Sequence, residues 1–504
     1  MSVTSVAIIG LEAEPVTVEA DIHRGQTAFF IVGLPDTAVK ESKERIIFAI
    51  KNSGFWFPRW HLTINLSPAD IKKQGTIHDL AMALSVLEAQ KDLTPESVKD
   101  SVFIGELGIH GEIRGVTGTL IAAIMAKEKG FKKIFVPKKN VNEALLIEGL
   151  EVFAVDNLEE LILHLRGETT LLPAEANPTI PTITASMIDF SDIRGQEHAK
   201  RGLEVAAAGG HNLLLHGPPG SGKTLLARAL PTILPALTPN EALEVTKIFS
   251  IAGAINEGQG LFVERPFRSP HHSCSAAALI GGGSWPRPGE VSLAHRGVLF
   301  LDEFPEFSRH VLEHLRQPME DGVVTISRAL ASLRFPAKFM MVAAMNPCPC
   351  GYAGDPHGRC TCSATRISAY KKKISGPLLD RIDLTVSVPR VETEKLTNQI
   401  SGEPSEVVRL RVQDARDRQL ARFAKVGIVS NSEMSPRMVC EFCELDEEGK
   451  KLIHAAMERW RLSARAYTRT LKLARTIADL DQSEKIISSH LAEALSYRGQ
   501  EDGI

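Results

Sequence analysis

The sequence lacks the features that would assign it to a membrane, fibrous or strongly basic class. Its formal net charge is only −3 over 504 residues, so no global basic field attracts nucleic acid and any such contact must be local. No apolar run is long enough to cross a bilayer, and no basic stretch precedes the short apolar segment near Met1. Long repeats and low-complexity tracts are absent. We therefore expect a cytoplasmic globular protein of about three domains, without membrane contact.

Cysteine is scarce, with seven residues in the chain. In a cytoplasmic protein these cysteines are not expected to form disulfide bonds. Four of the seven nevertheless crowd into one short segment, as Cys348, Cys350, Cys360 and Cys362. Two C-x-C pairs favour a tetrahedral zinc site, with His357 between them as an alternative ligand. The C-x-C spacing is less specific than C-x₂-C, and reduced thiols or redox chemistry are the alternatives.

The sequence does contain a phosphate-binding loop. An apolar run at 213–215 precedes it and a helical pattern follows it, which is the context in which GxxxxGK[ST] binds nucleotide. The glycines turn backbone N–H groups toward phosphate, the lysine reaches the β and γ phosphates, and the threonine hydroxyl holds Mg²⁺. The loop comprises Gly217, Pro218, Pro219, Gly220, Ser221, Gly222, Lys223 and Thr224.

A second motif completes this site. Residues 297–301 form a continuous apolar run, typical of a central strand in a helix-covered parallel sheet, and Asp302 and Glu303 follow it directly. Ligands of such sheets bind at the carboxyl ends of the strands. We therefore expect Asp302 to hold the metal with Thr224, and Glu303 to activate the attacking water. The two motifs together predict hydrolysis of ATP.

Composition divides the chain into four parts. Strand-like and helical runs alternate over residues 1–168, and a proline-rich linker follows at 169–185. The ATPase domain is expected over 186–395, with the cysteine cluster at 348–362, and a helical domain over 396–504. Lys223 and Asp302 are separated by far more than the ~30 residues of a βαβ unit, so the ATPase domain contains an insert.

Five long stretches carry a family resemblance. They spread over the ATPase and helical domains and read FRSPHHS (267–273), PGEVSLAHRGVLFLDE (288–303), MNPCPCGY (345–352), SGPLLDRIDL (375–384) and SARAYTRTLKLARTIADL (463–480). The chain resembles the magnesium-chelatase-like AAA+ ATPases, and within them the YifB/ComM family. The resemblance implies an α/β fold: an AAA+ P-loop core with a helical C-terminal lid, preceded by a Lon-protease-like (ribosomal S5 domain 2-like) α/β domain.

The resemblance also assigns three residue roles. Asn346 matches the sensor residue that orients the hydrolytic water, and Arg381 matches the arginine finger given to a neighbouring subunit's ATP. Arg465 matches the lid arginine that contacts the γ-phosphate. The alternative for both arginines is a salt bridge at the surface or between subunits, and Arg469 and Arg475 stand near Arg465 on the same helical segment.

Candidate DNA contacts lie on two glycine-rich or hairpin-like segments. Residues 319–337 alternate like a hairpin, and in related ring helicases such a hairpin projects into the central pore. Cations there suit a sequence-independent grip on phosphates, whereas Trp285 would stack on a base or pack in the fold. Each cation has the alternative of holding the fold or a subunit contact. The candidates are Arg265, Arg268, His271, His272, Arg287 and Arg328.

The first domain is not expected to be a protease. Residues 111–140 resemble the Lon proteolytic domain, which needs a serine activated by a lysine. Thr117 stands at the lysine position, and the segment 75–79 has no serine where the nucleophile is expected. Ring assembly or docking of a partner is therefore the expected role.

The resemblance implies an ATP-dependent hexameric DNA translocase that promotes branch migration of single-stranded or branched DNA during natural transformation, with recombination proteins as partners. A chelatase-type ATPase that remodels a protein partner or loads a metal is the alternative, and an ATP-gated assembly module that ignores DNA is a third. Stimulation of the ATPase by DNA separates the first of these from the others.

Overall fold

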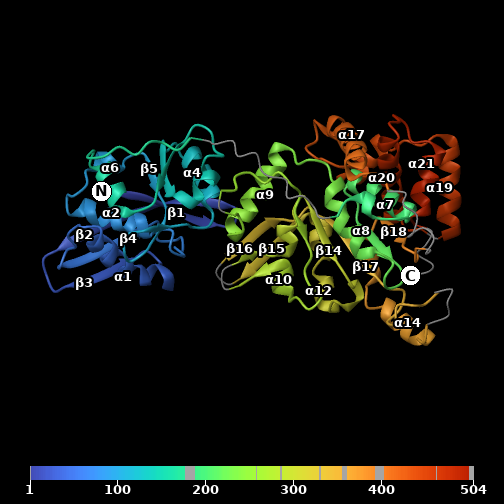
Figure 1. Ribbon diagram of the computed structural model, residues 1–504, viewed down its shortest axis with the longest axis horizontal. Helices are drawn as coiled ribbons and strands as arrows, with labels where there is room; N and C mark the ends of the chain where they lie inside the picture. The colour runs from blue at the N-terminus through green and yellow to red at the C-terminus, as the bar shows by residue number, and fades with distance from the viewer. Residues whose placement is uncertain are drawn as a thin grey trace.

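The computed structural model describes residues 2–175, 188–256, 258–283, 286–328, 331–354, 360–391, 402–460 and 462–498. The first α/β part and the C-terminal helices lie at opposite ends of an elongated molecule, and the ATPase core lies between them (Figure 1). Most of the expected linker falls outside the described residues.

The first part is built on a seven-stranded mixed sheet of order β3-β4-β2-β1-β5-β8-β9. Side chains alternate between its faces: Phe103, Phe135 and Phe153 pack on one side, and Val102, Ile134 and Val136 on the other. Helices α1, α2 and α6 cover the first face, and α4 and α5 cover the second. The strands are β1 (Val3–Ile9), β2 (Glu12–His23), β3 (Ala28–Val32), β4 (His61–Ser67), β5 (Ser101–Phe103), β8 (Lys133–Pro137) and β9 (Glu151–Val155), and a small hairpin pairs β6 (Glu106–Leu107) with β7 (Ile113–Arg114). The helices are α1 (Thr37–Asn52), α2 (Asp79–Ala89), α3 (Pro95–Val98), α4 (Thr119–Glu128), α5 (Val141–Ala144) and α6 (Leu158–Leu165).

The ATPase core is a five-stranded sheet of order β11-β14-β17-β10-β18, and every pairing in it is parallel. Its central strands β14 and β17 are apolar throughout, and β10 is apolar up to His216, as expected of a sheet that helices cover on both faces. Strands β14 and β17 are neighbours in this sheet. Asp302 and Glu303, which follow β14, therefore lie at the same end of the sheet as Asn346, which follows β17. The strands are β10 (Leu213–His216), β11 (Phe267–Arg268), β14 (Val298–Leu301), β17 (Met340–Met345) and β18 (Leu384–Ser387); the helices are α7 (Glu197–Gly209), α8 (Lys223–Ala229), α9 (Pro239–Ala252), α12 (Arg309–Glu313), α13 (Arg316–Asp321), α14 (Ala364–Lys371) and α15 (Gly376–Leu379).

Two hairpins extend from this core. The insert between the two ATPase motifs holds α10 (Ala276–Ile280), the hairpin β12 (Gly281–Gly282) and β13 (Arg287–Pro288), and α11 (Glu290–Leu293). The second hairpin pairs β15 (Val323–Arg328) with β16 (Ala331–Pro336), which places a hairpin in the second half of the expected segment, after α13. The hairpins touch each other, since a Cβ on Gly281 would lie 2.7 Å from Ile326.

The C-terminal helices share one hydrophobic core with the ATPase sheet. Apolar side chains of α17 and α20 pack with those of α7, so the lid is not a separately cored unit. The helices are α17 (Ser405–Phe423), α18 (Pro436–Phe442), α19 (Glu447–Trp460), α20 (Ala464–Leu480) and α21 (Ser488–Ser496). None of the helices in the described parts of the chain is long and apolar enough to cross a membrane.

The first part docks on the ATPase core through α4 and α9. The N–H of Gly118 donates to the carbonyl of Ser250 (3.0 Å), and the Ser250 hydroxyl donates to Glu143 (2.5 Å). Thr117, expected at the position of a Lon-type lysine, lies against Gly253 of the core. Thr117 is thus part of the contact between the first part and the core of one chain, and a role in ring assembly or in docking of a partner stays a prediction.

Candidate active site

The phosphate-binding loop joins β10 to α8 in the expected strand, loop and helix arrangement. Gly220 and Gly222 adopt left-handed φ angles of 75° and 93°, which glycine takes without steric cost. Gly217 must also be glycine, because a Cβ there would lie 2.1 Å from the Val388 carbonyl oxygen. The loop is therefore shaped as a backbone cradle.

Lys223 points into this cradle. Its Nζ donates to the carbonyls of Gly217 (2.7 Å) and Pro218 (2.8 Å) and to Oδ1 of Asn346 (3.1 Å). The expected sensor residue thus lies within hydrogen-bond distance of the P-loop lysine, although 123 positions separate the two.

Thr224 and Asp302 form the second half of the site. The Thr224 hydroxyl donates to Oδ2 of Asp302 (2.8 Å), and Oδ1 of the same carboxylate accepts the N–H of Glu303 (2.9 Å). A hydroxyl and a carboxylate that meet beside a phosphate cradle fit a Mg²⁺ ion bound together with ATP.

Glu303 leaves β14 in a left-handed conformation, with φ of 51°, which turns its side chain away from the strand direction. Its side chain is 56% exposed, and Oε2 lies 3.3 Å from Nδ1 of His272. His272, expected as a DNA contact, is therefore the neighbour of the expected catalytic base.

Burial lowers the pKa of Lys223 to about 8, and the nearby Asp302 raises it only in part. A lysine with this pKa is mostly charged at pH 7 and only about one-tenth charged at pH 9. We expect ATP to bind about tenfold more weakly at pH 9 than at pH 7, because a neutral amine does not attract the γ-phosphate. Titration with a fluorescent, non-hydrolysable ATP analogue measures this. Lys223→Arg stays charged and should give a flat profile; an equal slope in both proteins contradicts the prediction.

Arg381 and Arg465 meet on a shared carboxylate. The Arg381 guanidinium donates to Glu320 and to the Pro377 carbonyl (2.6 Å), and Arg465 lies 3.3 Å from the other oxygen of Glu320. Arg381 is buried, whereas the Arg465 side chain is 59% exposed. The two arginines that are expected to act on ATP therefore lie side by side, on either side of the Glu320 carboxylate.

The two arginines lie at the edge of the sheet opposite the phosphate loop. Asn212 precedes β10. Its backbone N–H donates to Oδ2 of Asp383 (3.0 Å), and its side-chain amide donates to the Arg381 carbonyl (3.0 Å). The phosphate loop leaves β10 at its other end, so the length of this strand, about 13 Å, separates Asn212 from the start of the loop.

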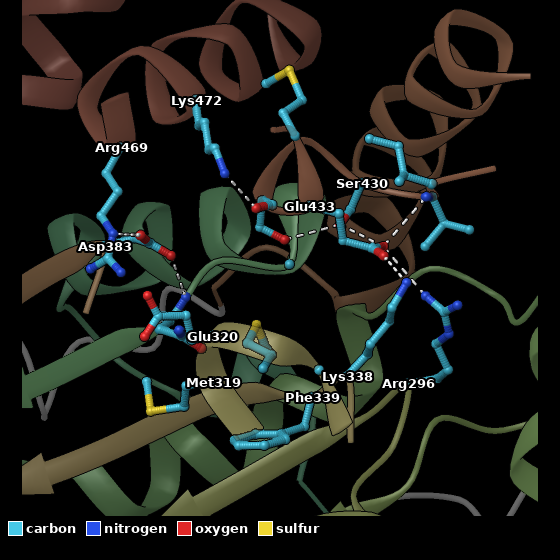
Figure 2. A pocket seen from close by; sticks show the side chains of 18 of the residues that line it. Arg296, Met319, Glu320, Lys338, Phe339, Asp383, Ser430, Glu433, Arg469 and Lys472 are labelled. Atoms are coloured by element: carbon cyan, nitrogen blue, oxygen red, sulfur yellow. Dashed lines mark hydrogen bonds and ion pairs between the residues drawn. The ribbon is translucent and has the colours of Figure 1, made fainter. Parts of the chain in front are cut away.

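A charged cavity of about 880 Å³ opens between this edge and the lid (Figure 2). Arg469 pairs there with Asp383 (3.4 Å), and Lys472 donates to the Ser432 carbonyl (2.8 Å). Arg475 is buried against Asp479 (3.0 Å). The two arginines that compete with Arg465 in the sequence are thus engaged inside their own chain, and Arg465 is the exposed one of the three.

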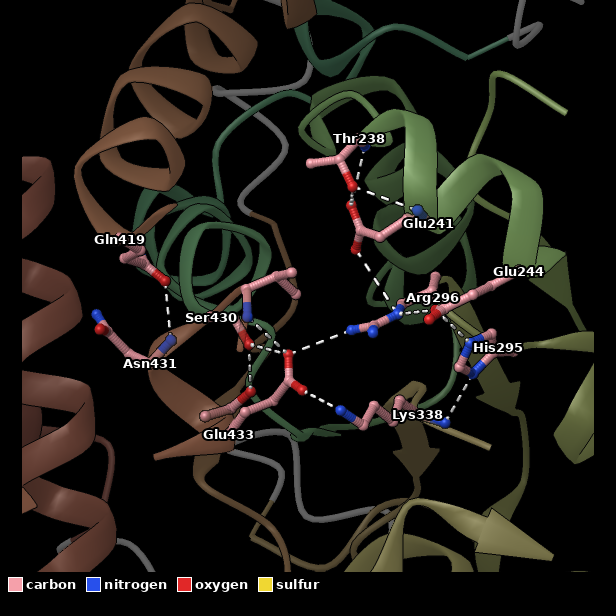
Figure 3. A network of polar contacts seen from close by, with 12 residues as sticks. Thr238, Glu241, Glu244, His295, Arg296, Lys338, Gln419, Ser430, Asn431 and Glu433 are labelled. Atoms are coloured by element: carbon pink, nitrogen blue, oxygen red, sulfur yellow. Dashed lines mark hydrogen bonds and ion pairs between the residues drawn. The ribbon is translucent and has the colours of Figure 1, made fainter. Parts of the chain in front are cut away.

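A partly buried ionic network ties the lid to the sheet edge (Figure 3). Glu433, in the short turn before α18, pairs with Arg296 (3.3 Å) and Lys338 (2.7 Å), which precede β14 and β17. Arg296 also pairs with Glu244 of α9 (2.9 Å). The network fixes the orientation of the lid relative to the strands that carry the catalytic groups.

The other expected DNA contacts have different environments. Arg265 is nearly buried, and all three guanidinium nitrogens are engaged, with Glu241 and nearby backbone carbonyls as acceptors; the structure thus gives it a fold-holding role, the alternative named above. Arg268 is paired with Glu290 by two bonds of 2.6 and 2.8 Å. Arg287 and His271 are exposed. Arg328 ends β15 at the tip of its hairpin; Trp285 and His357 lie outside the described residues.

The four cluster cysteines converge. Their sulfur atoms lie within 4.8 Å of one another, and Cys348 is fully buried. The Sγ–Sγ distances of Cys348 to Cys350 (3.3 Å) and to Cys360 (3.8 Å) are too long for disulfides. Four convergent thiols suit a soft, tetrahedrally coordinated ion.

Comparisons with known proteins agree over the full length. Models of magnesium chelatase subunit ChlI match residues 18–140 and 189–396, and a model of its C-terminal part matches 402–498. YifB of Escherichia coli K12 is 44% identical over 98% of this chain and 96% of its own length. The competence protein ComM of Haemophilus influenzae is 42% identical, over 98% and 97%.

The chain belongs to the YifB/ComM family of magnesium-chelatase-like proteins. The magnesium-chelatase 67 kDa subunit of Chlorobaculum parvum is a more distant relative, 32% identical over 32% of this chain and 24% of its own length. Family membership implies an ATPase of the AAA+ type, which agrees with the geometry around Lys223 and Asp302. The Lon-like character of the first part is a finer prediction that these comparisons do not test.

Sequence reasoning missed two residues of this YifB/ComM-family site and gave a third, His272, a different role. Glu320 holds both arginines, His272 reaches Glu303, and Gln196 donates from its side chain to the carbonyls of Ser221 (3.3 Å) and Pro389 (2.5 Å). Glu320 belongs to no recognisable motif, and Gln196 precedes the phosphate loop by a whole helix and strand. Only His272 carried a signal, because it lies within a stretch shared with the family.

Proposed function

We propose that this protein is an ATP-driven DNA translocase that works as a ring of six subunits and promotes branch migration in homologous recombination. One observation supports the assembly of subunits into a ring. Arg381 and Arg465 lie at the end of the sheet opposite the phosphate loop of their own chain. Two arginines that stabilise transferring phosphate must reach the nucleotide. They meet this requirement only when a neighbouring subunit presents its ATP to them.

Each shared site would then combine groups from two subunits. Lys223, Thr224 and Asp302 of one subunit hold ATP and Mg²⁺, while Glu303 and Asn346 position and activate the water. The neighbour supplies Arg381 and Arg465, which exchange Glu320 for the γ-phosphate. Thr224 and Asp302 would hold Mg²⁺, which would neutralise part of the phosphate charge.

Two adjacent hairpins support DNA as the substrate. Arg287 is exposed on the β12–β13 hairpin, and Arg328 ends the strand at the tip of the β15–β16 hairpin that contacts it. Cations on hairpin ends suit contacts with phosphates, which carry affinity without reading sequence. The relative from Haemophilus influenzae is named a competence protein, and we extend a role in DNA uptake and recombination to this chain on that basis.

A chelatase-type ATPase that remodels a protein partner or inserts a metal is the second candidate. The observation that favours it is the match of all three parts to the magnesium chelatase subunit ChlI. In this case the exposed Arg287 and the end of the β15–β16 hairpin would meet a protein surface.

The ATPase rate with added DNA decides between the candidates. We expect strong stimulation by single-stranded or branched DNA, more than by linear duplex, and loss of the stimulation at high salt because phosphate contacts release counterions. Lys223→Ala is the blank. A rate that ignores every DNA but responds to a partner protein would replace the translocase with the remodelling ATPase.

A further inference from the structure

The cysteine cluster rests directly on the phosphate-binding loop. Gly351, between the two C-x-C pairs, is so close to the loop that a Cβ would lie 2.4 Å from Cγ of Pro219. Cys348 follows Asn346 by two positions, and Asn346 is the residue that accepts Lys223 (3.1 Å). The cluster therefore contacts the phosphate loop through Gly351 and follows Asn346 closely along the chain.

A second contact involves the chain segment behind the phosphate loop. The ring of Tyr352, just after Gly351, lies 5.4 Å from the guanidinium of Arg390. Arg390 follows Val388, whose carbonyl lies against Gly217. The cluster loop thus touches both the phosphate loop and the chain segment that backs it.

The sulfur geometry fits a bound zinc ion. Tetrahedral Zn–S bonds of about 2.3 Å place the sulfurs about 3.8 Å apart. Cys360 lies 3.8 Å from Cys348 and 3.7 Å from Cys350. The N–H of Ala353 also donates to Sγ of Cys348 (3.3 Å), as backbone amides commonly do to a thiolate ligand.

We propose that Zn²⁺ held by Cys348, Cys350, Cys360 and Cys362 clamps the phosphate-binding loop, so that loading of the metal sets the affinity for nucleotide. The inference rests on the ATP site described above and adds a requirement to it. Without the ion, four thiols no longer fix the loop that carries Gly351. Nucleotide binding must then order the phosphate loop as well, and the free energy that this ordering costs lowers the affinity for nucleotide.

The test compares zinc content with nucleotide binding in the full-length protein. The zinc content per protein chain is measured by inductively coupled plasma mass spectrometry. Nucleotide binding is measured with a fluorescent ADP analogue, which needs no hydrolysis. Cys350→Ser and Cys360→Ser are expected to lose the zinc and to weaken ADP binding about tenfold or more. Cys440→Ser, an exposed cysteine on α18 outside the cluster, should keep both.

A pair of glycine variants tests the contact without touching the thiols. Gly351→Ala should keep its zinc yet bind ADP more weakly, because the new methyl group pushes on Pro219. Gly354→Ala is the matched control, since Gly354 has a similar φ (76° against 85°) but nothing within 4 Å of its Cβ position. These variants remain informative if the serine variants fail to fold.

The outcomes separate the clamp from the ATP site. Wild-type protein without zinc after growth with zinc overturns the metal site. Zinc-free serine variants that bind ADP like wild type overturn the clamp and leave the ATP site standing. If wild type and Lys223→Ala both fail to bind ADP, the proposed ATPase function itself falls.

Discussion

Replacing Glu303 by glutamine is expected to leave ATP binding intact and to slow hydrolysis by about 10²-fold or more. The amide has nearly the shape of the carboxylate but cannot accept a proton from water, and general-base catalysis contributes about 10²–10⁴ in rate. Lys223, Thr224 and Asp302 are untouched, so affinity for the nucleotide should stay within a factor of about two. Phosphate release and binding of a fluorescent ATP analogue measure the two quantities.

Glu306→Gln is the matched control for this change. Glu306 lies three positions further along the same segment, and its carboxylate pairs with Lys373 at 3.1 Å on the surface. Its variant should hydrolyse ATP at nearly the wild-type rate. Near-normal turnover of Glu303→Gln would remove Glu303 from the role of base and turn attention to other groups near the bound water.

Arg381→Ala is expected to lower the ATPase rate of the assembled protein by about 10³-fold or more, the range measured for arginine fingers. The phosphate loop of every subunit stays intact, so each still binds ATP. The rate falls because the positive charge of the Arg381 guanidinium no longer stabilises the transferring phosphoryl group. Arg316→Ala is the control, since Arg316 lies on α13 near Glu320 but pairs with Glu313 (2.7 Å).

Mixed rings test whether Arg381 acts on the neighbour. Arg381→Ala subunits lack the finger, and Lys223→Ala subunits lack the nucleotide, so each protein alone should be inactive. In a mixture, the phosphate loop of the first faces the arginine of the second, and part of the activity should return. A mixture as inactive as its components would place Arg381 and ATP in the same subunit.

The nucleotide-binding half of the site is the part that the sequence predicts well. Gly217–Thr224 and the run ending at Asp302 are local patterns whose chemistry follows from adjacent residues, and the structure brings Lys223, Asp302 and Asn346 together as expected. The α/β class and the helical C-terminal part follow equally from periodicity.

Long-range pairing is what the sequence could not supply. Arg265 looks like a free cation on a loop, yet Glu241 and backbone carbonyls engage it because the insert folds back on α9. Glu320 joins Arg381 and Arg465 across 61 and 145 positions. Charge and spacing identify a cation, but they do not identify which carboxylate the tertiary fold brings to it.

The shared core of the lid and the ATPase sheet has a mechanical consequence. Because α17 and α20 pack into the same cluster as α7, and Glu433 locks the lid to the strand ends through Arg296 and Lys338, the lid and core of one chain form a stiff lever. Bending it would expose apolar surface and separate Glu433 from Arg296, a pair that is largely covered by the surrounding protein. The joints of a working ring would then lie between the levers, at the nucleotides, so that each ATP hydrolysed tilts one whole protomer against the next.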